Sequence, residues 1–207
     1  AREAEIIELI RKEVKPALGC TEPIAVALAV AKAMEIIEEK CAPVAGWRMQ
    51  EGYCPRIEVS GNILKNGMGV GIPGTGMVGL HIAAALGAVC GRSEYGLEVL
   101  NDLDEASISR AKELVENKSV TVGLAETDLK LYVKTFVDYE GHCASAIIEN
   151  DHDNITETWF DSQLLVSSRK EAGIECPDQK TTLDYNLTVK EIVDFASTVA
   201  YDDIRFI

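Results

Sequence analysis

The sequence predicts an α+β fold: a glycine-rich loop between helices, followed by an antiparallel sheet meander packed on helices. Apolar residues recur at helical spacing early in the 207-residue chain and alternate with a period of two from about residue 120. Between these regions, seven glycines fall within residues 61–79. Helices followed by a block of strands are typical of α+β proteins, and the length fits a single domain over residues 1–207.

Helix boundaries follow from capping residues. A first helix is predicted over Glu3–Val14, before Pro16. Thr21 has the character of an N-cap, so the apolar run after it predicts a helix to about Lys40. Thr188 and Glu191 form a capping-box pattern that opens a last helix to about Tyr201. Two further helices are expected over Val78–Val89 and Asp104–Asn117.

The strands follow from alternation and turn residues. Glu140-Gly141 predicts a tight hairpin turn, and Asp151–Asn154 a longer one. The polar stretch Arg169–Thr182 is predicted to connect the sheet to the last helix. The expected strands are Arg56–Ser60, Val120–Ala125, Leu129–Tyr139, His142–Glu149 and Ile155–Phe160.

Composition limits the function classes. With 20 basic and 34 acidic residues the formal net charge is −14, so we expect no nucleic-acid partner. The longest apolar-rich run, Ile24–Ala31, is far shorter than the ~20 residues of a membrane span, so we expect no membrane association. Six scattered cysteines with no C-x-x-C pair favour reduced thiols and a cytoplasmic protein.

The first candidate site is the thiol of Cys20. If Thr21 caps the helix, Cys20 lies just outside a helix N-terminus, where the helix dipole favours a thiolate. We therefore expect its pKa to fall, which would suit a nucleophile or a soft metal ligand. The alternative is a buried structural cysteine.

The second candidate is the polar and glycine-rich run. Asn62, Lys65 and Asn66 place two amides and a cation within five residues, a set that can hold a carboxylate. Gly74-Thr75-Gly76 precedes a predicted helix, where backbone N–H groups bind anions. The alternative is a structural turn.

Other motifs are weaker. Gly69-x-Gly71-x-x-Gly74 matches the dinucleotide fingerprint formally, but no clear strand precedes it, so a nucleotide-dependent oxidoreductase is only a third option. His142 and His152 flank one predicted strand near turns, and either could serve as an acid or base.

At these motifs the sequence resembles the L-cysteine desulfidase family, which is related to the alpha part of iron–sulfur L-serine dehydratases. The resemblance rests on Pro16-Ala-Leu-Gly-Cys-Thr-Glu-Pro23, on Ser60-Gly-Asn-Ile-Leu-Lys-Asn66 and on Gly71-Ile-Pro-Gly-Thr-Gly76. It continues through Gly141-His142 and His152-x-Asn-Ile155 and covers most of the chain.

The resemblance implies a lyase that converts L-cysteine, or L-serine, to pyruvate and ammonia with release of sulfide or water. It also implies a [4Fe–4S] cluster held by three cysteines, with Cys20 as one ligand. Asn62, Lys65, Asn66 and Thr75 carry over to substrate binding, and Gly74 and Gly76 belong to the same site. His142 also carries over. The sequence does not identify the base: Lys65 and His142 are both candidates, and only placement near the substrate α-carbon decides between them.

One departure limits this expectation. In that family the other cluster cysteines lie in a further C-terminal helical region, which this chain does not contain. The chain is thus expected to be the N-terminal part of a longer enzyme, inactive alone and able to form a homo-oligomer through an uncovered face. The alternative function is a non-catalytic module that binds a small amino acid or anion.

Overall fold

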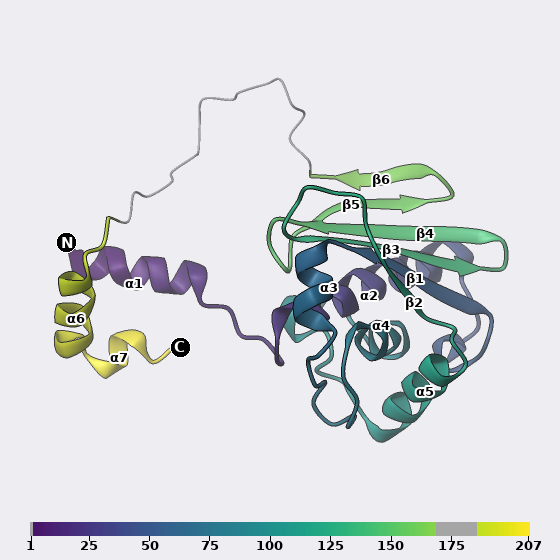
Figure 1. The fold of residues 1–207 in the computed structure, drawn as a ribbon, viewed down its shortest axis with the longest axis horizontal. Coiled ribbons are helices and arrows are strands. Elements are labelled where there is room, and N and C mark those ends of the chain that lie inside the picture. Colours follow the sequence, from purple (N-terminus) through teal and green to yellow (C-terminus); the bar gives the residue numbers. More distant parts are fainter. Residues whose placement is uncertain (1, 169–185) are drawn as a thin grey trace. The chain divides into compact units, whose positions relative to one another are not determined.

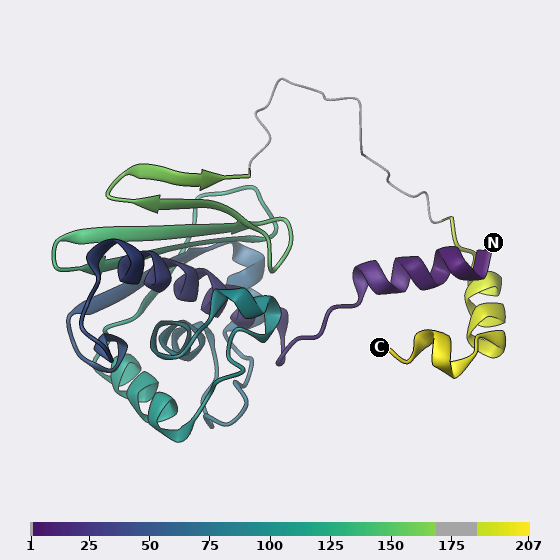
Figure 2. The same cartoon turned by 180° about the vertical axis from the view of Figure 1, so that it is seen from behind.

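The computed structural model describes residues 2–168 and 186–207, which fall into two units. The core unit runs from Ala17 to Arg169 and contains the sheet and most helices. The terminal unit combines Ala1–Pro16 with Lys170–Ile207. Figure 1 and Figure 2 show the fold of each from opposite sides. The predicted polar connection Arg169–Thr182 lies outside the described residues, and the single domain over residues 1–207 stays a prediction.

The core unit is a six-stranded sheet with helices on one face, so the predicted α+β class is confirmed. The strand order is β2-β1-β3-β4-β5-β6. The strands are β1 (Tyr53–Val59), β2 (Thr121–Leu124), β3 (Tyr132–Tyr139), β4 (His142–Glu149), β5 (Ile155–Phe160) and β6 (Gln163–Ser167). The helices are α2 (Thr21–Cys41), α3 (Gly61–Gly67), α4 (Leu80–Val89), α5 (Glu105–Glu116) and the short 3-10 turns η1 (Trp47–Met49) and η2 (Ser93–Glu98).

The sheet has two ends that matter for the site. Tyr53, Tyr139 and His142 pair across β1, β3 and β4 at one end, beside the Glu140-Gly141 turn, which we call the hairpin end. Val59 pairs with Val133 at the opposite end of the sheet, which we call the α3 end. There β1 continues into α3, and a turn connects β4 to β5. Figure 1 shows α3 and the β4–β5 turn at the same end of the sheet.

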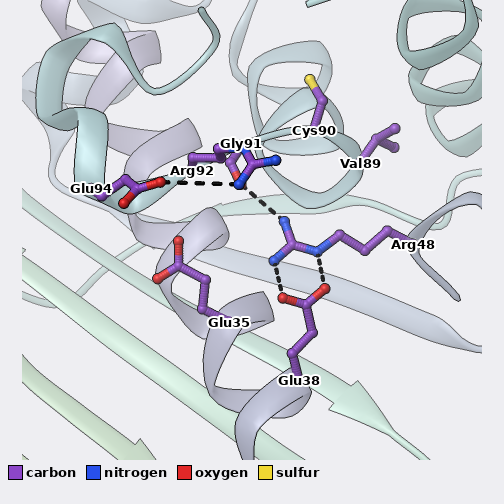
Figure 3. Close-up of a pocket in the computed structure, with 8 residues that line it drawn as sticks. All are labelled: Glu35, Glu38, Arg48, Val89, Cys90, Gly91, Arg92 and Glu94. Carbon is purple, nitrogen blue, oxygen red and sulfur yellow. Dashed lines mark hydrogen bonds and ion pairs between the residues drawn. The ribbon is translucent and has the colours of Figure 1, made fainter. Parts of the chain in front are cut away.

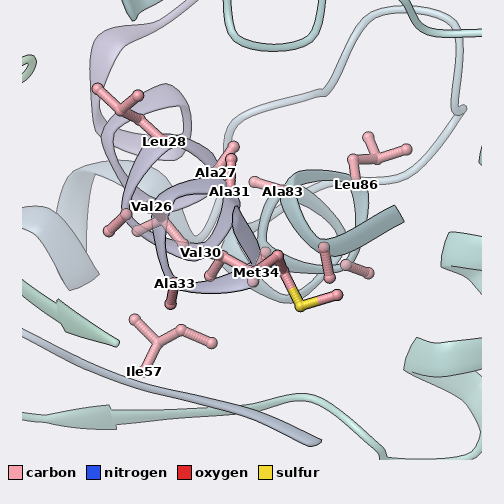
Figure 4. Packing of buried hydrophobic residues seen from close by; sticks show 14 of the residues in the cluster. Val26, Ala27, Leu28, Val30, Ala31, Ala33, Met34, Ile57, Ala83 and Leu86 are labelled. Atoms are coloured by element: carbon pink, nitrogen blue, oxygen red, sulfur yellow. The ribbon is translucent and has the colours of Figure 1, made fainter. Parts of the chain in front are cut away.

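The core lies between α2, α4 and the sheet (Figure 4). α2 is buried nearly all round because residues 25–31 are all Ala, Val or Leu, and each is at most 1% exposed. Its alanines let α4 approach closely. A Cβ on Gly87 would lie 2.4 Å from the carbonyl oxygen of Ala27, so the two backbones touch where only glycine fits.

Three details differ from the sequence prediction. The first part of the expected glycine-rich loop, Gly61–Gly67, is the helix α3, and the irregular stretch covers only residues 68–79. β2 pairs parallel with β1 at the sheet edge and so does not belong to the antiparallel meander. The meander instead ends with β6, which the sequence prediction missed.

The terminal unit contains three helices: α1 (Arg2–Glu13), α6 (Val189–Thr198) and α7 (Tyr201–Ile204). The predicted capping box at α6 is confirmed, since Thr188 accepts from the Glu191 N–H and the Glu191 side chain bonds back to the Thr188 N–H. Arg2 joins α1 to α6 through Glu191 at 3.1 Å. Ile6 is the only buried residue among those described in this unit.

Across the described stretches 2–168 and 186–207, none of the helices combines the length and apolar character needed to cross a bilayer.

Candidate functional site

Cys20 occupies the N-cap position of α2. Its backbone is extended (φ −68°, ψ 135°), and α2 begins at Thr21, one residue earlier than a Thr21 cap predicts. The Cys20 side chain makes no capping hydrogen bond and is exposed. Its thiol donates instead to Oε2 of Glu22 at 2.8 Å. The sulfur is therefore at the mouth of the helix, outside the apolar core.

Glu22 links this thiol to α3. While Oε2 accepts from Cys20, Oε1 accepts from Nδ2 of Asn66 at 3.3 Å. The approach is close because Gly67 is buried against the same region: a Cβ there would lie 3.6 Å from the Cβ of Glu22 and 2.4 Å from Cδ2 of Leu80. The two sequence motifs thus meet in space, through a carboxylate that the sequence analysis did not assign to the site.

The expected fall in the pKa of Cys20 is wrong. The pKa of the thiol is raised, first because it donates to the Glu22 carboxylate and second because it is partly buried. Backbone N–H groups at the helix start act in the opposite direction but are outweighed. The same hydrogen bond lowers the pKa of Glu22, with smaller contributions from Asn66 and from the charge of His152. The resting state at neutral pH is a thiol beside a carboxylate.

The side chains of α3 offer groups for a carboxylate. Asn62, Lys65 and Asn66 have the spacing i, i+3 and i+4, which places them on one face of a helix. All three residues are exposed. Of the three, Asn66 is joined to the thiol, through Glu22.

The glycine-rich stretch is a closed loop. Gly74, Gly76 and Gly79 have positive φ (79°, 68° and 99°), and the Ile72 N–H bonds to the Met77 carbonyl. Thr75 is 3% exposed; its hydroxyl donates to the Ile72 carbonyl at 2.7 Å and accepts from the Met77 N–H at 3.0 Å. The Thr75 hydroxyl is committed to the loop, and the substrate-binding roles of Gly74, Thr75 and Gly76 stay predictions.

The two histidines considered above lie at opposite ends of the sheet. His142 begins β4 at the hairpin end, with Nδ1 2.6 Å from Oδ2 of Asp161 and its ring stacked on Phe160. Eight strand residues, roughly 23 Å, separate it from the α3 end. His152 lies in the β4–β5 turn, close enough to act on the pKa of Glu22. The structure brings His152, and not His142, to the Cys20 end.

An apolar pocket lies against the residues that precede Cys20. It has a volume of about 510 Å³. Gly19, the residue before Cys20, lies 3.9 Å from Pro73 of the glycine-rich loop, measured from an ideal Cβ position. The pocket is lined by Ala17, Leu18, Gly19, Ile72, Pro73, Leu100, Asn101 and Leu103.

The described residues do not fit an iron–sulfur cluster. No group of three His, Cys, Asp or Glu side chains with metal-binding geometry occurs among residues 2–168 and 186–207. Cys41 is at the far end of α2, about 30 Å from Cys20. Cys54 and Cys143 are at the hairpin end, and Cys90 follows α4. Cys176 lies outside the described residues. The resemblance implies three thiolates for a cluster, and the residues that the structure describes supply one at this end of the molecule.

A second, polar pocket of about 270 Å³ lies near the C-terminal end of α2 (Figure 3). Arg48 binds both oxygens of Glu38 at 2.8 Å and donates to the Gly91 carbonyl at 2.9 Å. Burial alone would raise the pKa of Glu38, but hydrogen bonds from Arg48 and Trp47 outweigh it, so that pKa is lowered. Glu35 accepts from the Ser93 N–H at 2.7 Å. These groups satisfy one another and tie α2 to η1 and to the end of α4.

Comparison with known proteins identifies homologues. No family model and no solved structure matches the chain. It is 42% identical over 204 residues to a UPF0597 protein of Phocaeicola vulgatus, which covers 98% of this chain and 44% of that protein. A UPF0597 protein of Bacteroides thetaiotaomicron gives the same values. One from Aeromonas salmonicida is 38% identical over 207 residues, covering 100% and 44%. The chain thus spans less than half the length of these relatives.

Proposed function

We propose that this chain forms part of a lyase that eliminates the β-substituent of L-cysteine or L-serine, giving pyruvate and ammonia with sulfide or water. The observation that carries the proposal is the exposed thiol of Cys20 at the mouth of α2, joined through Glu22 to Asn66 of α3. An exposed thiol and a helix face with groups for a carboxylate are thereby neighbours, as the family resemblance requires.

Each side chain has a defined task in this proposal. The amides of Asn62 and Asn66 donate to the substrate carboxylate, and Lys65 supplies the charge that holds it. A base removes the α-proton while the bond to the β-substituent breaks. Of the two bases predicted from sequence, His142 lies at the other end of the sheet, and Lys65 holds the carboxylate only as the ammonium, which cannot accept the α-proton. His152, on the side of Glu22, is the base candidate at this end.

The cofactor belongs to the proposal only through the resemblance. Cys20 is the one cluster ligand that the described residues offer at this site. Two further thiolates would have to come from outside them, and the relatives have more than twice the length over which such ligands could lie. We therefore derive no step of the reaction through a cluster.

Binding of amino acids to the 207-residue chain tests the site. We expect L-serine and L-cysteine to bind and to shift backbone amide resonances of α3 and of the start of α2, whereas D-serine does not. Lys65→Ala should weaken binding by roughly tenfold, because it removes a charge-assisted contact. Lys112→Ala, on α5, is the matched control. Absence of L-serine binding would contradict the proposed site.

Turnover tests the reaction. After anaerobic incubation with iron and sulfide, the longest form of the protein that the gene encodes should release pyruvate from L-cysteine or L-serine. The 207-residue chain should stay colourless and inactive. A brown and active 207-residue chain would contradict the expectation that further ligands are needed.

A non-catalytic amino-acid-binding module is the second candidate, favoured by the single thiol at the site. Cys20→Ala separates the two functions. In the lyase it abolishes turnover by the longest form while amino-acid binding persists. In a module the wild-type protein never forms pyruvate, and the substitution changes nothing.

A further inference from the structure

We infer that the apolar pocket beside Cys20 receives an organic substituent on the substrate sulfur, so that the site cleaves the C–S bond of S-alkyl-L-cysteines. This inference rests on the proposed function and extends its substrate class. It is carried by the position of the pocket, its lining and its size.

The position follows from the chain around Cys20. On its C-terminal side, Glu22 reaches Asn66 and the polar face of α3. On its N-terminal side, Leu18 and Gly19 line the pocket. Cys20 is therefore the residue of the chain between the pocket wall and the contact with the polar face of α3. An amino acid held by its carboxylate on α3, with its side chain extending past Cys20, enters this pocket.

The lining suits hydrocarbon. Most of the wall is made of Ala, Leu, Ile and Pro side chains, and Asn101 supplies the one polar side chain. Ile72 and Leu100 are 6% and 5% exposed, so the core holds these walls in place. A hydroxyl moved into such a site loses hydrogen bonds to water without replacement, whereas sulfur and methylene groups gain from burial.

The size exceeds what a thiol fills. Pockets for small organic ligands have volumes of roughly 300–1,000 Å³, and this one has about 510 Å³. A single sulfhydryl occupies a small part of that space. A substituent of several carbons on the sulfur would fill more of it and would exclude water from the C–S bond.

The reaction balances without an added oxidant or reductant. The base takes the α-proton, the Cα–H electron pair forms the Cα=Cβ bond, and the alkyl thiolate leaves with the electron pair of the Cβ–S bond. The thiolate takes up a proton to become a thiol. The aminoacrylate that remains tautomerises to an imine, and water hydrolyses it to pyruvate and ammonium.

A series of ligands tests the inference by calorimetry on the 207-residue chain. The ligands are L-serine, L-cysteine and the S-methyl, S-ethyl and S-propyl derivatives of L-cysteine. We expect the dissociation constant to fall about fourfold with each added methylene, as burial of ~0.8 kcal/mol per CH₂ predicts. S-propyl-D-cysteine should bind at least tenfold more weakly than its L form.

Two exposed apolar residues give matched variants. Leu18→Gln changes a pocket wall whose side chain is 39% exposed, and Val44→Gln changes a residue that is 67% exposed and outside the pocket. Leu18→Gln should flatten the dependence on chain length and leave L-serine affinity within twofold. Val44→Gln should preserve the whole series. Both sites are exposed, so both variants should fold, which circular dichroism checks.

The outcomes separate the two proposals. If L-serine and L-cysteine bind but affinity does not rise along the series, the substrate class inferred from the pocket is overturned and the proposed function stands. The same holds if S-propyl-D-cysteine binds as tightly as the L form, because the pocket then selects hydrocarbon alone. If none of the L-amino acids binds, the proposed site fails and the inference fails with it.

Discussion

The two ends of α2 hold similar kinds of side chain in opposite states. At the N-terminal end, Cys20 and the polar face of α3 are exposed, and their hydrogen bonds are few. At the C-terminal end, Glu38 and Arg48 are bonded to each other and to the surrounding backbone. Polar groups with unused hydrogen-bonding capacity can bind a ligand, whereas groups that satisfy one another stabilise the fold. Charge alone does not mark a site.

At the hairpin end of the sheet, a histidine likewise belongs to a set of groups that satisfy one another. His142 and Asp161 form a close pair that also holds the Cys143 N–H at 2.9 Å. A His–Asp pair is a frequent acid–base element, yet here it fastens two neighbouring hairpins. At the α3 end, by contrast, the charge of His152 lowers the pKa of Glu22, the carboxylate beside the thiol.

The largest expected effect concerns the close contact between α2 and α4 in the core. Gly87→Ala should lower the free energy of unfolding by about 3 kcal/mol, because its Cβ would meet the α2 backbone, which cannot move aside. Gly67→Ala is the matched variant, where the Cβ meets the end of the Leu80 side chain, and should cost about 1 kcal/mol. Urea unfolding measures both. Equal losses would contradict the distinction between backbone and side-chain contacts.

The next-largest effect concerns the polar contacts at the C-terminal end of α2. Arg48→Met should destabilise the chain by about 2 kcal/mol, because it removes an arginine that is only 14% exposed, leaves the Glu38 carboxylate without its cation and frees the Gly91 carbonyl. Arg92→Met removes an arginine that is 58% exposed and bonded to Asp102 at 2.7 Å, and should cost little. Urea unfolding compares the two variants. A larger loss for Arg92→Met than for Arg48→Met would contradict the structural role assigned to the Arg48–Glu38 pair.

A smaller effect changes the state of the thiol. Glu22→Gln should lower the pKa of Cys20, because the carboxylate that holds the thiol proton is removed. Alkylation of Cys20 by iodoacetamide at pH 7.5 should then become about fivefold faster, measured by peptide mass spectrometry. Glu94→Gln, on η2, should leave the rate unchanged. The same rate–pH curve in Glu22→Gln and the wild type would contradict the role of Glu22.

The smallest effect concerns Asp161. Its pKa is lowered first by the hydrogen bond with His142 and second by the Cys143 N–H. A carboxyl group whose pKa is lower in the folded state stabilises the protein above its unfolded pKa, and that contribution is lost as the pH falls through the folded pKa. Asp161→Asn should therefore lower Tm at pH 6 by at most about 2 °C, with the difference disappearing in acid. A difference that grows in acid would contradict this sign.

Much of the fold follows from local signals. The predicted N-terminal region of α5 is confirmed because Asp104 accepts from the Ser107 N–H, and the capping box of α6 is confirmed at Thr188. β6 was missed because its turn consists of Asp161 and Ser162, both at positive φ without a glycine to signal it. The parallel pairing of β2 was missed because tertiary contacts between distant segments decide it.

The candidate site was predictable only in part. The capping signal at Thr21 places Cys20 at a helix start. The spacing of Asn62, Lys65 and Asn66 explains why these polar residues share one face of α3. Glu22 was overlooked because an acidic residue in a first turn has an ordinary role there. The sign of the thiol pKa was wrong because one neighbouring carboxylate outweighs the helix dipole. His142 was preferred to His152 because the resemblance carries over His142, and alternation alone does not show which of the two lies near Cys20.

The parallel β1–β2 pair has a consequence for the order of folding. Arg56 meets Thr121 only after the whole segment with α3, α4 and α5 has crossed over, whereas β3 to β6 are joined by short turns. Pairing of distant segments requires a large loop to close and is slow. We expect β2 to dock last and its amides to exchange with solvent fastest among the strands. The hairpins would then form the early template on which the helices assemble.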